Sequence, residues 1–125
     1  MKRLIVLLCA LYLVLVYGTA SAGPDDMPLS FQASPDVYQV MVDNDEMRVV
    51  LATWQPGQKD KDHSHPMIAV YTIKDCQLRV TTPDGKSRDV SNKAGLARIN
   101  QPVKSHSVEN IGKTECQQVL VELKK

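Results

Sequence analysis

The chain has 125 residues, of which 43% are hydrophobic, and its formal net charge is +1. This length suits one compact domain, and a near-neutral charge without a basic stripe argues against a nucleic-acid partner. The absence of a basic amphipathic helix likewise argues against a role on a membrane surface.

The first 22 residues have the pattern of a secretory signal peptide. Lys2 and Arg3 precede an apolar run over residues 4–17, and small residues lead up to Ala22. The run is shorter than the roughly 20 residues that a membrane-spanning helix needs. We therefore predict cleavage after Ala22, no stable membrane anchor afterwards, and a periplasmic or secreted location. An uncleaved N-terminal anchor is the alternative.

The rest of the chain divides into an arm and one domain. Residues 23–35 contain three prolines and little periodicity, which predicts an extended N-terminal arm. The domain spans residues 36–125, where no segment keeps a helical period over three turns. Its alternating segments predict about eight short antiparallel strands, and hence an all-β sandwich or small barrel. We expect these strands at residues 37–42, 47–54, 67–74, 77–82, 87–91, 96–100, 106–111 and 115–123, with the clearest hairpin at residues 83–85.

Two cysteines, Cys76 and Cys116, follow the leader. An oxidising compartment favours a disulfide between them. The pairing also requires Cα atoms within about 7 Å, which the sequence does not show. A disulfide and two buried apolar thiols therefore both remain open.

The histidines are the strongest functional signal in the chain. It has three, His63, His65 and His106. Residues two apart on a strand face the same side, so the first two can offer two imidazoles to one ion while a distant strand supplies the third. Three neutral imidazoles suit one divalent transition metal such as Fe, Zn, Mn, Ni or Cu. The alternative is a solvated loop, because the charged residues 60–62 precede the pair.

These spacings resemble the two motifs of the cupin superfamily. The sequence departs from the first motif at its glutamate, where Ala69 or Val70 stands, and from the second at a glycine, where Val103 stands. The resemblance implies a double-stranded β-helix, or jelly-roll barrel, whose three histidines converge at the barrel mouth on two neighbouring strands. The matching positions are Gly57, His63, His65, Gly95, His106 and Asn110.

The residue runs 63–66, 83–85 and 106–112 most resemble RmlC-like small single-domain cupins associated with β-alanine degradation. The superfamily resemblance also implies a homodimer.

A three-histidine site without a carboxylate leaves the charge of the ion uncompensated, which favours an anionic chelating ligand. The leading hypothesis is an exported cupin that binds a divalent metal and binds or acts on a small carboxylate or oxygen-rich metabolite. If it is an enzyme, the lack of an evident general base favours a dioxygenase-type or isomerase-type reaction over hydrolysis. The alternative is a non-catalytic periplasmic module that binds a small molecule or a metal, and a barrel filled by its own side chains is a third reading.

Three further residues are candidates for the pocket. Tyr71 either offers its phenol to a ligand or packs on the sheet. Arg98 shares a strand phase with Asn100 and either binds a carboxylate inside the barrel or faces solvent. Asn110 shares a face with His106 and either points into the site or stabilises a turn. Trp54 is assigned to the core.

Overall fold

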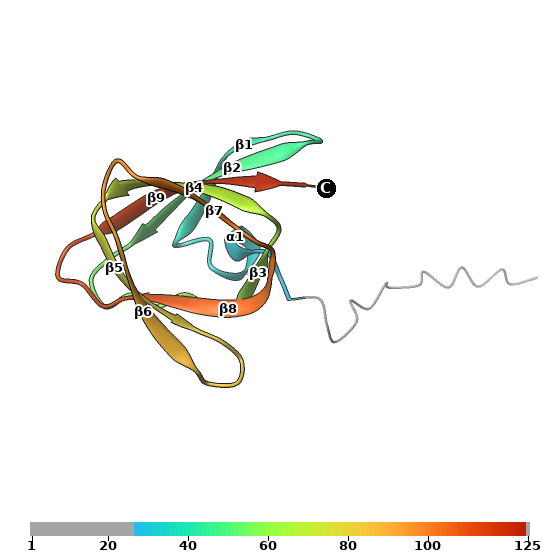
Figure 1. The fold of residues 1–125 in the computed structure, drawn as a ribbon. Coiled ribbons are helices and arrows are strands. Elements are labelled where there is room, and N and C mark those ends of the chain that lie inside the picture. Colours follow the sequence, from blue (N-terminus) through green and yellow to red (C-terminus); the bar gives the residue numbers. More distant parts are fainter. Residues whose placement is uncertain (1–26, 125) are drawn as a thin grey trace, which may run out of the picture.

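A computed structural model describes residues 27–124, so the predicted signal peptide lies outside the described residues. This part of the chain folds into two antiparallel sheets that face each other, with one short helix, α1 (Ser30–Ala33), beside them (Figure 1). No helix within it is long and apolar enough to cross a membrane. The strands are β1 (Tyr38–Asp43), β2 (Met47–Trp54), β3 (His63–His65), β4 (Ile68–Lys74), β5 (Cys76–Thr81), β6 (Ser87–Asn92), β7 (Ala97–Asn100), β8 (Val103–Asn110) and β9 (Cys116–Leu123).

Strands that are distant in sequence lie side by side in both sheets. The five-stranded sheet has the order β1-β2-β9-β4-β7, and the four-stranded sheet has the order β3-β8-β5-β6. The prediction of an all-β fold is confirmed, and β2 covers the predicted residues 47–54. The strand missing from the eight expected segments is β3, which carries the histidine pair. The predicted hairpin at residues 83–85 joins β5 to β6, and Gly85 adopts a φ of 81°, which glycine tolerates best.

Alternating residues give each sheet one inward face. Along β2, Val50, Ala52 and Trp54 are buried, and along β9 Leu120 lies opposite Val50. The assignment of Trp54 to the core is confirmed. The core consists of Val37, Tyr38, Val50, Ala52, Trp54, Ile68, Val70, Cys76, Leu78, Val108, Cys116 and Leu120.

Cys76 and Cys116 form a disulfide between the start of β5 and the start of β9. These strands belong to different sheets, so the bridge ties the two sheets together. The structure thus contains a disulfide rather than two free thiols. Closing a loop of this size stabilises a fold by roughly 3–4 kcal/mol.

Residues 27–35 differ from the predicted extended arm. They contain α1, which packs beside β3, and Ser30 and Ser34 are buried (Figure 1). The hydroxyl of Ser34 accepts a hydrogen bond from the backbone of Lys61 at 2.9 Å, and that of Ser30 lies 3.5 Å from the Glu122 carboxylate. Local sequence predicts an arm because these partners lie far along the chain.

Candidate metal centre

Two adjacent antiparallel strands carry the three histidines. His63 on β3 lies opposite His106 on β8, and His65 follows on the same face of β3. The side chain of His63 is fully buried, and His65 is only 6% exposed. The arrangement on neighbouring strands is confirmed. The alternative of a solvated loop is wrong, because Asp60 is buried along with the pair it precedes.

The ring nitrogens of the three histidines converge. The Nε2 atom of His63 lies 3.0 Å from Nε2 of His65 and 3.1 Å from Nε2 of His106. Metal–nitrogen bonds are about 2.1 Å long, and two nitrogens this far apart would meet at such an ion at roughly a right angle. That angle is the one between adjacent ligands of an octahedron. The three residues therefore fit one divalent transition ion with positions left over for a ligand.

Hydrogen-bond partners fix which ring nitrogens are free. Nδ1 of His63 lies 2.7 Å from the carbonyl oxygen of Lys61, and Nδ1 of His65 lies 3.4 Å from a carboxylate oxygen of Glu122. Both partners are acceptors, so the Nδ1 atoms carry the protons and the Nε2 lone pairs point at one another. Lone pairs 3.0 Å apart repel unless a cation lies between them. Metal-binding histidines are typically held in this way.

His63 and His106 remain neutral near pH 7. Burial lowers the pKa of His63 to about 4, with the neighbouring His65 adding to the effect. Burial lowers the pKa of His106 to about 3, and His63, His65 and Arg88 lower it further. Neutral imidazole is the form that binds a metal, so these two residues require no deprotonation at neutral pH.

Glu122 lies behind His65 and is fully buried. Its second carboxylate oxygen accepts a hydrogen bond from Arg48 at 3.1 Å. Burial alone would raise the pKa of Glu122, but the hydrogen bonds from His65 and Arg48 outweigh it and leave the pKa below its ordinary value. The ionised carboxylate therefore orients His65. Glu122 was not among the residues predicted for the site, although the alternation along β9 places it on the same inward phase as Leu120.

Asp60 lies behind His63 at the centre of a buried network. Its carboxylate accepts hydrogen bonds from the Tyr38 hydroxyl at 2.7 Å and from Trp54 Nε1 at 3.2 Å. A third hydrogen bond comes from the Val108 backbone at 2.6 Å. Burial raises the pKa of Asp60 to about 6 in spite of these bonds. The Tyr38 hydroxyl also lies 3.3 Å from Nε2 of His63, so it borders the centre itself.

No carboxylate occupies the position of the cupin glutamate. Ala69 is exposed on the outer face of β4, and Val70 packs in the core. Within the described residues, the cluster that could hold a metal ion consists of the three histidines alone. Asp60 and Glu122 approach the Nδ1 atoms instead, at 3.7 Å from His63 and 3.4 Å from His65.

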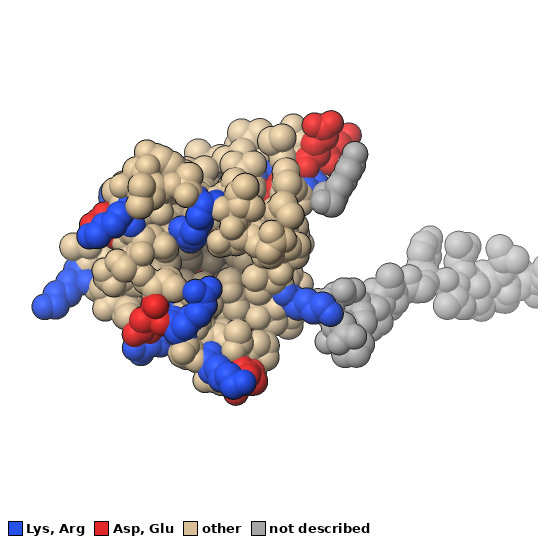
Figure 2. Space-filling model, viewed as in Figure 1, with Lys and Arg blue, Asp and Glu red and all other residues tan. Residues whose placement is uncertain are grey.

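A cavity of about 500 Å³ opens beside the centre. His65, His106 and Trp54 line it together with apolar residues of both sheets. No aspartate or glutamate is among its lining residues, whereas Arg88 and Arg98 are. Figure 2 shows basic side chains bordering a hollow on this face of the molecule.

The structure brings one of the three further pocket candidates to the cavity. Arg98 lines it together with Asn100, so the inward alternative holds for both. Tyr71 lies on the outer face of β4, is 49% exposed, and is not among the lining residues. Asn110 is buried outside the lining, where its side chain accepts a hydrogen bond from the Gly112 backbone at 2.9 Å and donates to two backbone carbonyls. It stabilises the turn after β8.

Comparisons with known proteins identify the fold. No family model and no curated protein matches this chain. Among solved structures, a cupin domain from Bordetella pertussis Tohama I superimposes with a TM-score of 0.66 at 26% identity, covering 71% of this chain and 93% of that one. A double-stranded β-helix protein from Klebsiella pneumoniae gives a TM-score of 0.55 at 22% identity, covering 70% of this chain and 75% of that one.

A cupin superfamily protein from Desulfitobacterium hafniense DCB-2 gives a TM-score of 0.53 at 9% identity, again covering 70% of this chain and 75% of that one. At such low identities these similarities establish architecture and not activity. The resemblance to the β-alanine group stays a prediction, because none of these three proteins is described by that activity. The chain has the double-stranded β-helix fold of the cupins, as its histidine spacing predicted.

Proposed function

We propose that this protein is an exported small cupin that binds one divalent transition metal through His63, His65 and His106 and binds or acts on a small carboxylate or oxygen-rich metabolite. The convergence of the three Nε2 atoms carries the proposal. Two of these nitrogens are left with free lone pairs by the acceptors behind them, which is the state that a metal requires.

The charge of the cavity supports an anionic ligand. A divalent ion at the three histidines would have no carboxylate ligand from the protein to compensate it. The guanidinium group of Arg98 faces the same cavity, whose lining contains no acidic residue. Clefts lined by one sign of charge raise the local concentration of ligands of opposite charge.

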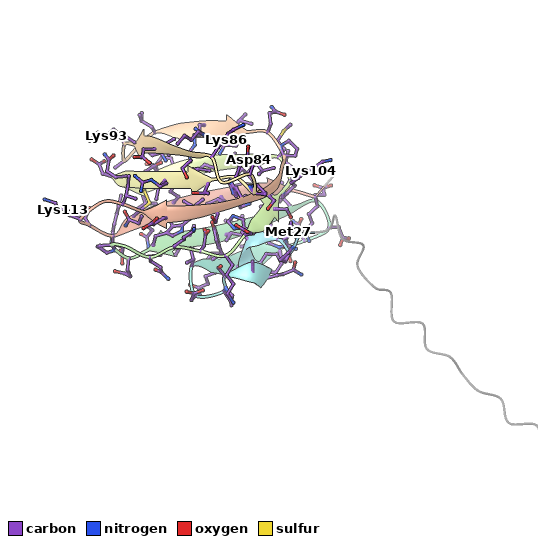
Figure 3. All side chains as sticks on the ribbon, turned by 90° about the horizontal axis from the view of Figure 1, so that it is seen from below. Met27, Asp84, Lys86, Lys93, Lys104 and Lys113 are labelled. Atoms are coloured by element: carbon purple, nitrogen blue, oxygen red, sulfur yellow. A yellow bond between two sulfur atoms is a disulfide. The ribbon has the colours of Figure 1, made fainter. Side chains whose placement is uncertain are left out.

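Metal analysis tests this proposal. The protein is purified without chelator and its metal content is measured by inductively coupled plasma mass spectrometry, beside that of a His63→Ala, His106→Ala double variant. We expect about one equivalent per chain in the wild type and near zero in the double variant. Lys104→Ala is the matched control, because Lys104 lies on β8 but is exposed (labelled in Figure 3). Equal, near-zero metal in all three proteins would contradict the proposal.

Measurements of turnover would distinguish an enzyme from a protein that only binds its ligand. A bound metal would supply Lewis-acid chemistry or, with iron, oxygen activation. In the dioxygenase-type reading, oxygen is consumed when β-dicarbonyl or thiol compounds are added to the metal-loaded protein. Isomerase-type activity would show as conversion of substrate without oxygen uptake. No turnover by either measure across a broad panel favours the alternative of a non-catalytic binding module.

We propose that the protein works in the periplasm or outside the cell. The disulfide between Cys76 and Cys116 supports this location, because such bonds persist in oxidising compartments. N-terminal sequencing of protein recovered from a periplasmic or culture fraction should start at Gly23. Recovery of the full-length chain in the cytoplasmic fraction alone would contradict the location.

We also propose a homodimer that packs through the outer face of the five-stranded sheet. Two rows of hydrophobic residues cross β2, β9, β4 and β7 on this face: Leu51, Val119, Tyr71 and Ala97, then Val49, Val121, Ala69 and Ile99. Uncharged faces can meet their own copies without repulsion between like charges, and burying apolar surface stabilises the contact.

The mass in solution should therefore be that of a dimer, and Val121→Lys should shift it to that of the monomer. A monomeric wild type would contradict the proposal.

A further inference from the structure

We propose that Arg88 and Arg98 form an anion-binding subsite in the cavity, and that the ligand is a small dicarboxylate whose two ends lie at the histidines and at this arginine pair. The inference rests on the proposed function for the end at the histidines. The arginine subsite itself is defined by contacts that do not involve a metal.

The two arginines enter the cavity from opposite sheets. Arg88 lies on β6, the edge strand of the four-stranded sheet, directly across from Val80 on β5. Arg98 lies on β7, the edge strand of the five-stranded sheet, directly across from Val70 on β4. Both valines also line the cavity, so both arginines lie on inward strand phases. The ends of a ligand inside the cavity can therefore meet guanidinium groups from two walls.

Neither arginine has an acidic partner within residues 27–124. The ion pairs of that part of the chain do not include Arg88 or Arg98, and the lining of the cavity contains no carboxylate. The side chain of Arg98 makes its hydrogen bond to a neutral amide, that of Gln118, at 3.5 Å. Burial lowers the pKa of Arg98, and the neighbouring charge of Arg88 lowers it further. Arg98 is partly buried and Arg88 is exposed, and both line the same cavity, so two like charges there favour an anion between them.

On the outer face of the hairpin of β5 and β6, Arg79 has the kind of acidic partner that Arg88 lacks. It lies on β5, and it pairs with Asp89 on β6 at 2.8 and 3.1 Å. This pair lies on the outer face of the sheet, whereas Arg88, the residue before Asp89 on β6, is also exposed but lines the cavity without an acidic partner. A guanidinium group binds a carboxylate through two parallel hydrogen bonds, as Arg79 does here. A ligand carboxylate would supply what the cavity lacks.

The histidine end and the arginine end lie within reach of one small molecule. Val80 on β5 lies between Val108 on β8 and Arg88 on β6, so Arg88 is two strands away from the strand of His106. Two strand spacings are about 10 Å, and His106 lies two residues, or roughly 7 Å, from Val108 along β8, so the Cα atoms of Arg88 and His106 are about 12 Å apart. A span of this size has room for a short carbon chain between two carboxylates. A monocarboxylate would neutralise one end and leave the other without a partner.

The single tryptophan of the chain gives a direct readout, because Trp54 lines the cavity. Its fluorescence is followed while succinate or monomethyl succinate is added at low ionic strength, to metal-loaded and to chelator-treated protein. The two compounds have nearly the same size and differ by one charge. Metal-loaded wild type should bind succinate at least tenfold more tightly than the monoester, because a hydrogen bond between charged groups contributes roughly that factor or more.

Variants of Arg88 and Arg98 test whether these arginines cause the preference for succinate over the monoester. Arg88→Gln and Arg98→Gln should each weaken succinate binding about tenfold or more and reduce its advantage over the monoester. Arg88→Lys should retain part of the affinity, because it keeps the charge but loses the two parallel hydrogen bonds. Arg79→Gln is the matched control and should bind as the wild type does. Far-UV circular dichroism of every variant establishes that it is folded.

The outcomes distinguish this inference from the proposed function. If folded Arg88→Gln and Arg98→Gln bind succinate as tightly as the wild type, or if the wild type does not prefer succinate, the arginine subsite is overturned. A normal metal content in those same variants would leave the metal proposal standing. If the wild type contains no metal but its succinate binding still depends on both arginines, the subsite stands and the metal proposal fails.

Discussion

The two ends of the cavity are built in opposite ways. At the histidine end, His63 and His65 are held from behind by the Lys61 carbonyl and by Glu122. At the other end, Arg88 and Arg98 face the cavity with no acidic partner in the described part of the chain. A centre whose ligands are fixed before binding loses little entropy when the ion arrives. We infer that the fold holds the histidines ready for a metal and leaves the arginines free for the ligand.

Removing Asp60 should have the largest effect on stability. Asp60→Ala leaves the Tyr38 hydroxyl, the Trp54 indole and one backbone amide buried without an acceptor. Each buried, unsatisfied group costs about 1–3 kcal/mol, so the free energy of unfolding should fall by roughly 3 kcal/mol or more. Urea denaturation measures the change. Asp89→Ala removes an exposed acid and should cost far less stability than Asp60→Ala. Equal losses in the two variants would refute the supporting role of Asp60.

Weakening the support of His65 should reduce metal affinity while the three histidines stay in place. Glu122→Gln keeps the shape of the side chain but removes the charge that holds His65 and pairs with Arg48. Loss of such a partner typically lowers metal affinity by about 10- to 100-fold. Competition with a chelator of known affinity measures the change. An unaltered affinity in folded Glu122→Gln would show that the carboxylate does not tune the site.

Acid should destabilise the metal-free protein. The folded-state pKa values of His63 and His106, about 4 and about 3, lie below the ordinary histidine value, so the unfolded chain binds more protons as the pH falls below 6.5. Asp60 acts in the opposite direction, because its folded-state pKa is raised to about 6. Two groups outweigh one, so the free energy of unfolding should fall between pH 6.5 and pH 4.

Urea titrations of chelator-treated protein at several pH values across this window measure that slope. A stability that rises as the pH falls would contradict the burial of neutral histidines.

The smallest effect on metal and ligand binding is expected at Tyr71. Its side chain is half exposed on the outer face of β4, away from both ends of the cavity. Tyr71→Ser should therefore leave metal content and succinate affinity unchanged, in contrast to Arg98→Gln. Fluorescence titration of both variants makes the comparison. A tenfold loss of succinate affinity in Tyr71→Ser would show that the cavity extends to this face.

The sequence predicted the parts of the site that follow from strand phase. Two histidines at i and i+2 must share a face, and the motif spacing to His106 indicated the neighbouring strand. The surrounding acids were missed because their partners are distant in sequence. Glu122 lies 57 residues from His65, and Asp60 lies 22 residues from Tyr38. Alternation along residues 115–123 is compatible with an inward Glu122, but it gives no indication of which side chain this residue would meet.

At residues 27–35, too, contacts that are distant in sequence decide the structure. Their prolines predicted an extended arm, and local sequence alone gives no indication that Ser34 bonds to the backbone of Lys61, 27 residues later. The sequence showed that Arg98 and Asn100 lie on the same face of their strand, but not whether that face points into the barrel or toward solvent. Pairing with β4, where Val70 and Ile68 are buried, is what turns that face inward.

One metal ion is expected to lie among the three Nε2 atoms. Crystals of protein purified without chelator, measured at the absorption edge of the metal found by elemental analysis, would show its position directly as anomalous density. We expect a single strong peak about 2.1 Å from Nε2 of His63, His65 and His106. A peak elsewhere, or no peak while the three Nε2 atoms hydrogen-bond to one another, would contradict it.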